Sequence, residues 1–184
     1  MNPTIHRRLI DAFRWVDPGP HVTHLVSDAS GWWRDPELLR SLGPELGALH
    51  PGAQPTAVLA PQISGVLLGP LVAVALGAGF VEAYRDERID RIADARPPLR
   101  VVTEPDHKGR TVALAIRDDR LSPGDRVLVV DDWADSGAQL TALRELIRQA
   151  GAEYLGAAVI VDGCPGPVSA ALNLQGLLRP ADLG

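Results

Sequence analysis

Apolar residues in the first fifty positions recur three or four residues apart, which is the spacing of an amphipathic helix. This spacing predicts a helix over residues 4–16, whose apolar stripe is Ile5, Leu9, Ile10, Phe13 and Val16. A second helix is predicted from Asp35 and Pro36 onward, because Asp is a good N-cap and Pro fits a first helical turn. The stretch 21–34 between the two helices is predicted to be irregular.

From residue 56 onward the chain contains short, wholly apolar runs, which are typical of strands covered on both faces of a parallel sheet. They predict two strand–helix–strand units, with elements at 56–60, 66–76 and 80–84 and then at 127–130, 138–150 and 155–161. Two further strand-like runs, 99–103 and 111–116, are joined by Glu104–Arg110. The predicted fold class is α/β, a doubly wound and mainly parallel sheet with an antiparallel excursion.

Composition limits the classes of function. The 184 residues include 46% hydrophobic and 22% charged residues, which predicts a single folded domain over residues 1–184. The 18 basic and 23 acidic residues give a net charge of −5, which argues against binding to nucleic acid. Cys164 is the only cysteine, so an internal disulfide is excluded and a reducing cytoplasm is expected.

No targeting or membrane segment is expected. The N-terminal residues lack the long apolar run of a secretory signal. The longest apolar run, 66–81, is interrupted by Gly and Pro and is too short to span a bilayer. The five histidines show no metal-ligand spacing, so we expect no metal held by protein side chains.

The segment VLVVDDWADSGAQL, residues 127–140, carries the candidate chemistry. Asp131 and Asp132 follow an apolar strand, and ligands of open parallel sheets bind beyond such strand ends. Two carboxylates accept hydrogen bonds from the neighbouring hydroxyls of a ribose. The predicted loop 131–137 then enters a helix, and small residues at a helix N-terminus suit an anion. Together these features predict a ribose 5-phosphate site, with the phosphate at Asp135, Ser136, Gly137, Ala138 and Gln139.

This segment resembles the 5-phosphoribosyl-1-diphosphate (PRPP) motif of type I phosphoribosyltransferases. Residues 65–85 and the run Pro123–Arg126 are similar to the adenine phosphoribosyltransferase branch, and the likeness covers about residues 20–162. The resemblance implies a flexible antiparallel hairpin and a small hood, a cover over the base formed by about residues 1–50 and 163–184. It also implies a homodimer, and Mg²⁺ bound mainly through PRPP.

The resemblance further implies residues for the diphosphate and the base. Candidates for the diphosphate are Ile63, Ser64, Gly65, Arg85, Lys108 and Arg110. The chain departs from the adenine branch in having Ser64 where an Arg is common, and Ser136–Gln139 where the family has a Thr-Gly-Gly-Thr-like loop. Residues 104–110, which stand in the place of the mobile loop of that branch, also lack its usual Glu-Tyr pair.

Asp135 is hypothesised to be the general base, since the hypoxanthine-guanine branch has an acid at this place. The alternative is an acceptor that stabilises the loop. Trp133 offers an apolar face to a stacked base or serves as a packing residue. Trp32 and Trp33 are candidates for the hood, for a dimer contact or for hydrophobic cover of the core. Lys108 and Arg110, the candidates for the diphosphate, have the alternative of a solvated hairpin tip.

The implied activity is transfer of the 5-phosphoribosyl group from PRPP to a ring nitrogen of a purine-type nucleobase or related heteroaromatic, in salvage or specialised metabolism. Asp131 and Asp132 would hold the ribose next to the developing positive charge. One alternative is a non-catalytic regulatory protein that binds PRPP or a nucleotide, and another is a nucleotide-binding α/β protein with unrelated transfer chemistry. No helix-turn-helix or basic extension accompanies the motif.

Overall fold

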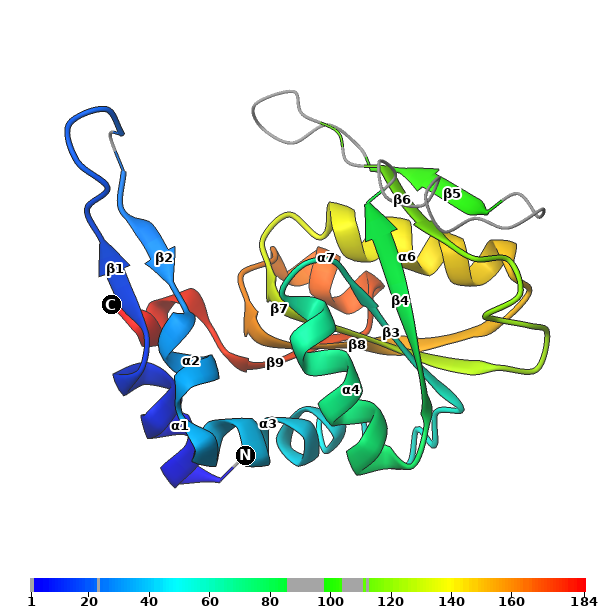
Figure 1. Ribbon diagram of the computed structural model, residues 1–184, viewed down its shortest axis with the longest axis horizontal. Coiled ribbons are helices and arrows are strands. Elements are labelled where there is room, and N and C mark those ends of the chain that lie inside the picture. Colours follow the sequence, from blue (N-terminus) through cyan, green and yellow to red (C-terminus); the bar gives the residue numbers. More distant parts are fainter. Residues whose placement is uncertain (1, 23, 86–97, 104–110, 112) are drawn as a thin grey trace.

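The computed structural model describes residues 2–22, 24–85, 98–103, 111 and 113–184. The strands of its main sheet are β3 (Ala57–Pro61), β4 (Gly79–Arg85), β5 (Leu99–Val102), β6 (Ala113–Ile116), β7 (Arg126–Ala134), β8 (Glu153–Asp162) and β9 (Leu174–Leu178). These seven strands lie in the order β5-β6-β4-β3-β7-β8-β9 (Figure 1). The helices are α1 (Pro3–Asp11), α2 (Ser30–Arg34), α3 (Pro36–Gly47), α4 (Gly65–Leu76), α6 (Ala138–Gln149) and α7 (Gly166–Ala171), with a 3-10 turn η1 (Pro180–Leu183).

The central strands are parallel and the edge is antiparallel. β4, β3, β7, β8 and β9 run in one direction, whereas β6 is antiparallel to β4 and β5 is antiparallel to β6. This confirms the predicted α/β fold, with its doubly wound sheet and antiparallel excursion. Residues 104–110 between β5 and β6, which include Lys108 and Arg110, lie outside the described residues.

Both faces of the sheet are covered by helices, which explains the wholly apolar runs in its central strands β3 and β7. Leu59 and Val129 pack into a core with α6, while their neighbours Val58 and Leu128 pack into a second core with α3 and α4. All four side chains are fully buried. Successive side chains of a strand point to opposite faces, so burial of both faces requires consecutive apolar residues.

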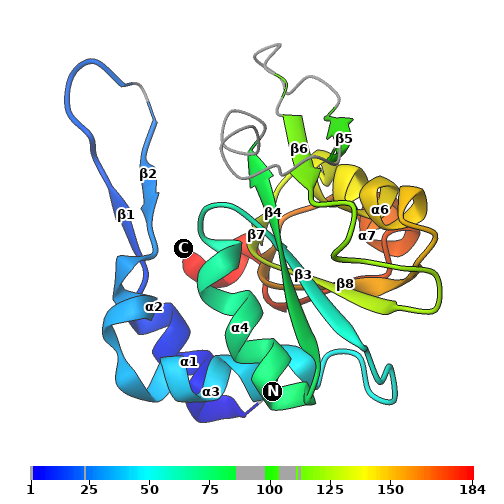
Figure 2. The same ribbon diagram turned by 45° about the vertical axis from the view of Figure 1, so that its right-hand side comes forward.

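The N-terminal region differs from its prediction. The first helix ends at Asp11, not at residue 16, and Arg14–Val16 form the short strand β1. β1 pairs antiparallel with β2 (Val26–Asp28), and this hairpin projects from the rest of the chain (Figures 1 and 2). Residues 21–34 were predicted to be irregular, but they contain β2 and α2. The two partner strands lie about ten residues apart in the sequence, so their pairing leaves no local pattern. The helical spacing of Phe13 and Val16 therefore led to the wrong end of the predicted helix.

Trp32 fixes α2 to α1. Its side chain is fully buried, and its indole Nε1 donates a 2.9 Å hydrogen bond to the carbonyl oxygen of Leu9. The ring also lies 5.7 Å from that of Phe13, centre to centre. Trp32 is therefore a core residue, in agreement with one of its three interpretations. None of the described helices has the length and apolar character needed to cross a membrane.

Candidate active site

The acidic pair lies inside β7, near the carboxyl ends of the parallel strands. β7 continues to Ala134 because β8 pairs with it as far as the partners Ala134 and Asp162. The predicted loop from residue 131 to 137 is therefore wrong in its first half, and the loop begins after Ala134. Asp131 is buried and Asp132 is half-buried, but their carboxyl groups lie close enough to interact.

Asp131 is almost completely buried, with 3% of its surface exposed. Its Oδ1 accepts a 2.9 Å hydrogen bond from the backbone N–H of Asp132, and its Oδ2 accepts a 2.8 Å hydrogen bond from Nε2 of Gln139. Burial, and secondly the neighbouring Asp132 carboxylate, raise the pKa of Asp131 well above its ordinary value. The protein itself thus supplies a partner to each oxygen of Asp131.

Asp132 is half-buried. Its Oδ1 accepts a 2.9 Å hydrogen bond from the backbone N–H of Trp133. Its carboxylate also interacts with the side chain of Asp131, and no basic side chain of the described residues pairs with it. Asp132 therefore retains acceptor capacity for the hydroxyl groups of a bound sugar.

The loop after β7 turns tightly into α6. Gly137 has a φ of 78°, and a Cβ atom at this position would lie 2.6 Å from Cγ1 of Val168. Both observations require glycine at this turn. Ser136 and Ala138 are also brought together, because Ser136 Oγ accepts a 3.3 Å hydrogen bond from the N–H of Ala138. The backbone of this loop lies at the N-terminus of α6, where an anion is favoured.

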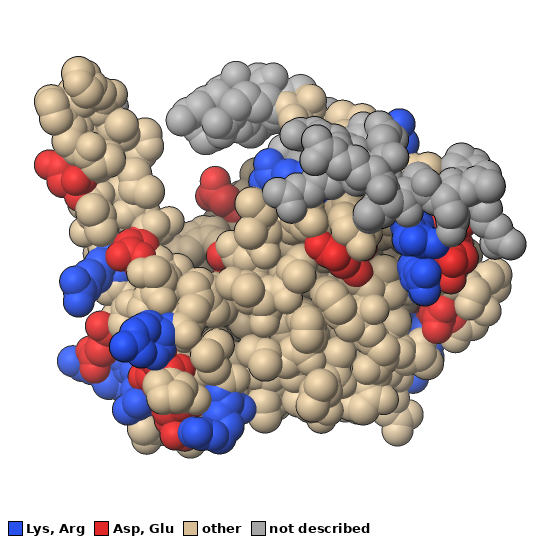
Figure 3. All heavy atoms as spheres, viewed as in Figure 1, with Lys and Arg blue, Asp and Glu red and all other residues tan. Residues whose placement is uncertain are grey.

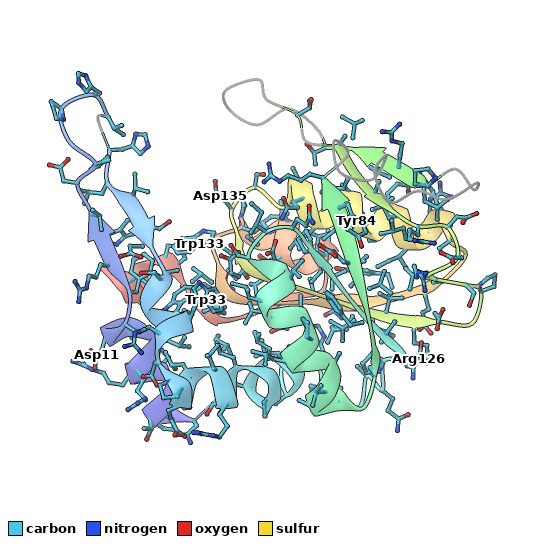
Figure 4. The ribbon with its side chains drawn as sticks, viewed as in Figure 1. Asp11, Trp33, Tyr84, Arg126, Trp133 and Asp135 are labelled. Carbon is cyan, nitrogen blue, oxygen red and sulfur yellow. The ribbon has the colours of Figure 1, made fainter. Side chains whose placement is uncertain are left out.

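Asp135 is exposed on this loop and points away from the sheet (Figure 4). Within the described part of the chain, no backbone N–H or side chain donates a hydrogen bond to its carboxylate. Asp131, Asp132 and Asp162 all accept such bonds. The interpretation of Asp135 as a loop-stabilising acceptor thus has no hydrogen bond to support it.

The loop after β3 lies beside the acidic pair. A Cβ atom on Gly65 would lie 3.0 Å from Oδ1 of Asp131 and 2.8 Å from Cδ of Pro61, so this close approach also depends on glycine. Gln62 joins the loop to β4, because its Nε2 donates a 2.6 Å hydrogen bond to Oε1 of Glu82. Ile63 is 70% exposed, and Arg85 is exposed at the end of β4.

An aromatic cluster forms one wall next to Asp132 and Asp135. Trp133 lies 6.0 Å from Phe13 and 6.2 Å from Trp15, measured between ring centres, with Trp15 packed edge-on. Trp15 comes from β1 and is 38% exposed. Sequence analysis missed Trp15, because a three-residue strand has too few positions for an alternating pattern. Trp133 is half-buried, so one part packs and another part is accessible.

Comparison with known proteins identifies the family. The model of the phosphoribosyl transferase domain matches residues 49–167 of this chain. The chain belongs to the phosphoribosyltransferase family. The predicted resemblance to the type I enzymes and their adenine branch is confirmed by the relatives and by the fold.

Two relatives and one solved structure illustrate the likeness. The xanthine phosphoribosyltransferase of Lactobacillus delbrueckii subsp. bulgaricus is 33% identical over 128 residues. These residues are 70% of this chain and 66% of that protein, so this chain matches just under two thirds of that relative's length. The adenine phosphoribosyltransferase of Methylorubrum populi is 29% identical over 85% of this chain and 83% of its own. The crystal structure of adenine phosphoribosyltransferase from Rhodothermus marinus superposes with a TM-score of 0.80, at 26% identity, and covers 97% of this chain and 99% of that one.

Two departures of this phosphoribosyltransferase from the adenine-branch pattern lie close to Asp131. Ser64 directly precedes the glycine that packs against Asp131 Oδ1, and Gln139 donates to its Oδ2. The amide of Gln139 is therefore directed to Asp131 in this structure. Its predicted role as a phosphate ligand stays a prediction.

Cys164 lies beneath the same loop. A Cβ atom on Gly137 would lie 3.5 Å from its sulfur. Burial, together with the carboxylates of Asp162 and Asp135, raises the pKa of the Cys164 thiol to about 11. This thiol is a poor nucleophile near neutral pH, because the thiolate is the reactive form.

Proposed function

We propose that this phosphoribosyltransferase transfers the 5-phosphoribosyl group of PRPP to a ring nitrogen of a purine-type nucleobase or a related heteroaromatic and releases diphosphate. The observation that carries the proposal is the arrangement at the end of β7. The acidic pair is followed by a glycine turn and by the N-terminus of α6, and the loop that begins α4 lies beside them. Relatives named adenine and xanthine phosphoribosyltransferase support a purine-type acceptor.

Each part of PRPP has a proposed partner in this arrangement. The Asp131–Asp132 pair serves the ribose hydroxyls, and the backbone N–H groups of residues 135–139, with the hydroxyl of Ser136, serve the 5-phosphate. The diphosphate lies against Ile63, Ser64 and Gly65, with Arg85, Lys108 and Arg110 as cationic partners. Trp133 provides an apolar face for the base.

The bond between C1 and the diphosphate oxygen breaks, and the diphosphate leaves with the bonding electron pair. The ring nitrogen of the base forms the new bond to C1, and its proton passes to Asp135. The carboxylate of Asp132 lies near the ribose and stabilises positive charge that develops at C1.

Mg²⁺ is proposed to accompany PRPP. Among the described residues, no group of three or more His, Cys, Asp or Glu side chains is placed to hold a metal ion. The carboxylate oxygens of this site are compatible with Mg²⁺, which commonly binds through substrate phosphates. We therefore propose that the ion is bound mainly by the oxygens of PRPP and supplies positive charge to the leaving diphosphate.

A calorimetric titration of the chain with PRPP and Mg²⁺, followed by a diphosphate-release assay with adenine, guanine, hypoxanthine and xanthine, tests this function. We expect saturable PRPP binding, and release that requires both PRPP and one of the bases. Binding without release for any base would favour the regulatory alternative. Absence of PRPP binding would reject both functions.

We also propose a homodimer formed through the outer face of α4, in the cytoplasm. Ile63, Leu67 and Val74 are 70%, 50% and 84% exposed, and α4 contains no charged residue. Figure 3 shows a broad surface without charged side chains over this helix. A helix that is apolar on all sides is normally buried. In a twofold-symmetric dimer, the same uncharged face of a second copy would pack against this surface, and both faces would be buried.

Val74→Arg tests this interface. The substitution is expected to convert the dimer into a monomer of 19.6 kDa, because a guanidinium would be buried without a partner. Size-exclusion chromatography with light scattering measures the mass directly. Gln149→Arg is the matched control, because it adds the same charge at an exposed position on α6. Ala75→Arg would be unsuitable, because Ala75 adjoins the proposed interface on α4. A monomeric wild type, or a dimeric Val74→Arg, would contradict the proposed interface.

A further inference from the structure

Gln62 lies at the start of the loop after β3, directly before the candidates for the diphosphate. Its backbone N–H donates a 2.9 Å hydrogen bond to the carbonyl oxygen of Ala83, which continues the pairing of β3 with β4. Its side chain adds two further bonds to β4. Nε2 donates a 2.6 Å hydrogen bond to Oε1 of Glu82, and Oε1 accepts a longer one of 3.4 Å from the backbone N–H of Arg85. One side chain thus joins the beginning of this loop to the end of β4.

Glu82 is itself held in place for this contact. It is half-buried and shares one face of β4 with Tyr84, whereas Val81 and Ala83 are buried on the other face. The hydroxyl of Tyr84, near the end of β4 (Figure 4), donates a hydrogen bond to the carboxylate of Glu82. Burial, and secondly the charge of this carboxylate, raise the pKa of Tyr84. The carboxylate of Glu82 therefore accepts hydrogen bonds from two neighbouring side chains.

The candidates for the diphosphate come from two separate segments of the chain. Ser64 and Gly65 begin α4, and the side chain of Ser64 makes no capping hydrogen bond there. Arg85 is exposed at the end of β4, and no side chain of the described residues forms an ion pair with its guanidinium. On the side of β7, the loop is fixed by the close packing of Gly65 against Asp131. On the side of β4, it is fixed by the side chain of Gln62.

We infer that Gln62 is a positioning residue for the diphosphate half of PRPP, which through its bond to Glu82 sets the loop 63–65 against Arg85. The inference rests on the proposed function for its ligand and deepens it. Glu82 has the same sign of charge as a diphosphate, so it offers this ligand no attraction of its own. Its contribution is an acceptor that directs the amide nitrogen of Gln62 to β4. The amide oxygen is then left for the backbone N–H of Arg85.

Neutral substitutions test this contact without adding charge next to an anionic ligand. Gln62→Met and Glu82→Met keep a long side chain but remove the hydrogen bond from one side or the other. Glu82→Gln keeps an acceptor oxygen and removes only the charge. Charge and contact predict opposite results for Glu82→Met. Loss of a negative charge strengthens the binding of an anion, whereas loss of the positioning bond weakens it.

Calorimetry measures the affinities for inorganic diphosphate with Mg²⁺, for PRPP with Mg²⁺ and for ribose 5-phosphate, which lacks the diphosphate. We expect Gln62→Met and Glu82→Met each to weaken the binding of diphosphate and PRPP about tenfold, and to change that of ribose 5-phosphate less than about threefold. The double variant Gln62→Met/Glu82→Met should bind about as tightly as either single variant, because both remove the same bond. Glu82→Gln should bind diphosphate at least as tightly as the wild type.

Gln149→Met is the matched control. Nε2 of Gln149 donates a 3.3 Å hydrogen bond to Oε1 of Glu145, so this substitution breaks the same kind of bond at the last residue of α6, which is exposed. It should leave all three affinities unchanged. If Glu82→Met does not fold, Glu82→Thr replaces it, because threonine suits a strand but is too short to reach Gln62.

Four results would overturn the inference. Undiminished diphosphate binding by Glu82→Met would show that Gln62 does not act through Glu82. Equal losses for ribose 5-phosphate and diphosphate would show general damage to the site. Losses that multiply in the double variant would show two independent roles. Diphosphate binding by Glu82→Gln as weak as that by Glu82→Met would contradict the inference, because the contact is intact in Glu82→Gln.

Failure of the proposed function has a different signature. If the wild type binds diphosphate but not PRPP, the function is rejected, and the diphosphate affinities of the variants still decide the inference. If the wild type binds PRPP and the Gln62 and Glu82 variants bind it equally well, the function stands and the inference is overturned. Absence of binding to both PRPP and diphosphate in the wild type would reject the two together.

Discussion

Asp135→Asn is expected to lower turnover about 100-fold or more while PRPP binding changes little. Asparagine has the shape of aspartate but cannot accept the proton of the attacking nitrogen. Asp135 is exposed on the loop between β7 and α6, and no described residue donates a hydrogen bond to its carboxylate. The substitution therefore removes the proposed proton acceptor without removing an internal contact of the loop.

Initial rates of diphosphate release and calorimetry with PRPP separate the two effects. Asp119→Asn is the matched control, because it makes the same change at a surface carboxylate that pairs with Arg117 and Arg120. Normal turnover in Asp135→Asn would remove this residue from the mechanism. Parallel loss of PRPP affinity and turnover would instead identify Asp135 as part of the ligand-binding loop.

Trp32→Ala is expected to lower the free energy of unfolding by about 3–5 kcal/mol. The substitution leaves a large cavity between α1, α2 and α3, and it leaves the carbonyl oxygen of Leu9 without its hydrogen-bond donor. Both effects destabilise the folded state, since the surrounding residues relax only in part.

Urea unfolding followed by circular dichroism measures this loss. Trp33→Ala is the matched control, because Trp33 is adjacent, has the same size and is only half-buried. We expect a clearly smaller effect for Trp33→Ala. Equal losses in the two variants would show that the burial of Trp32 does not decide the stability of this region.

The parallel sheet was predictable because its strands and helices carry local patterns. The apolar runs around Val58 and Val129 indicated strands covered on both faces, and the core confirms it. The order of apolar strand, acidic pair, glycine turn and helix also predicted that the acidic pair lies near the carboxyl end of its strand, where the structure has it. These features depend on residues close together in the sequence, so a single sequence contains them.

Features that depend on distant partners were not predictable. β7 extends past Asp132 because β8 pairs with it to Asp162, and α1 ends at Asp11 because the following residues pair with β2. The burial of Asp131 depends on Gly65 and Gln139, which lie at the starts of two different helices, α4 and α6. No periodicity in the sequence encodes such contacts, so the two acids appeared equivalent.

The apolar cluster under the aromatic wall has a consequence for how this chain folds. It contains Ile5 and Leu9 from α1 together with Leu178 and Leu183 from the other end of the sequence. Bringing segments so far apart in the sequence into one cluster costs conformational entropy, and many such long-range contacts slow folding. We therefore expect the region of Phe13, which belongs to this cluster, to depend on both ends of the chain for its stability.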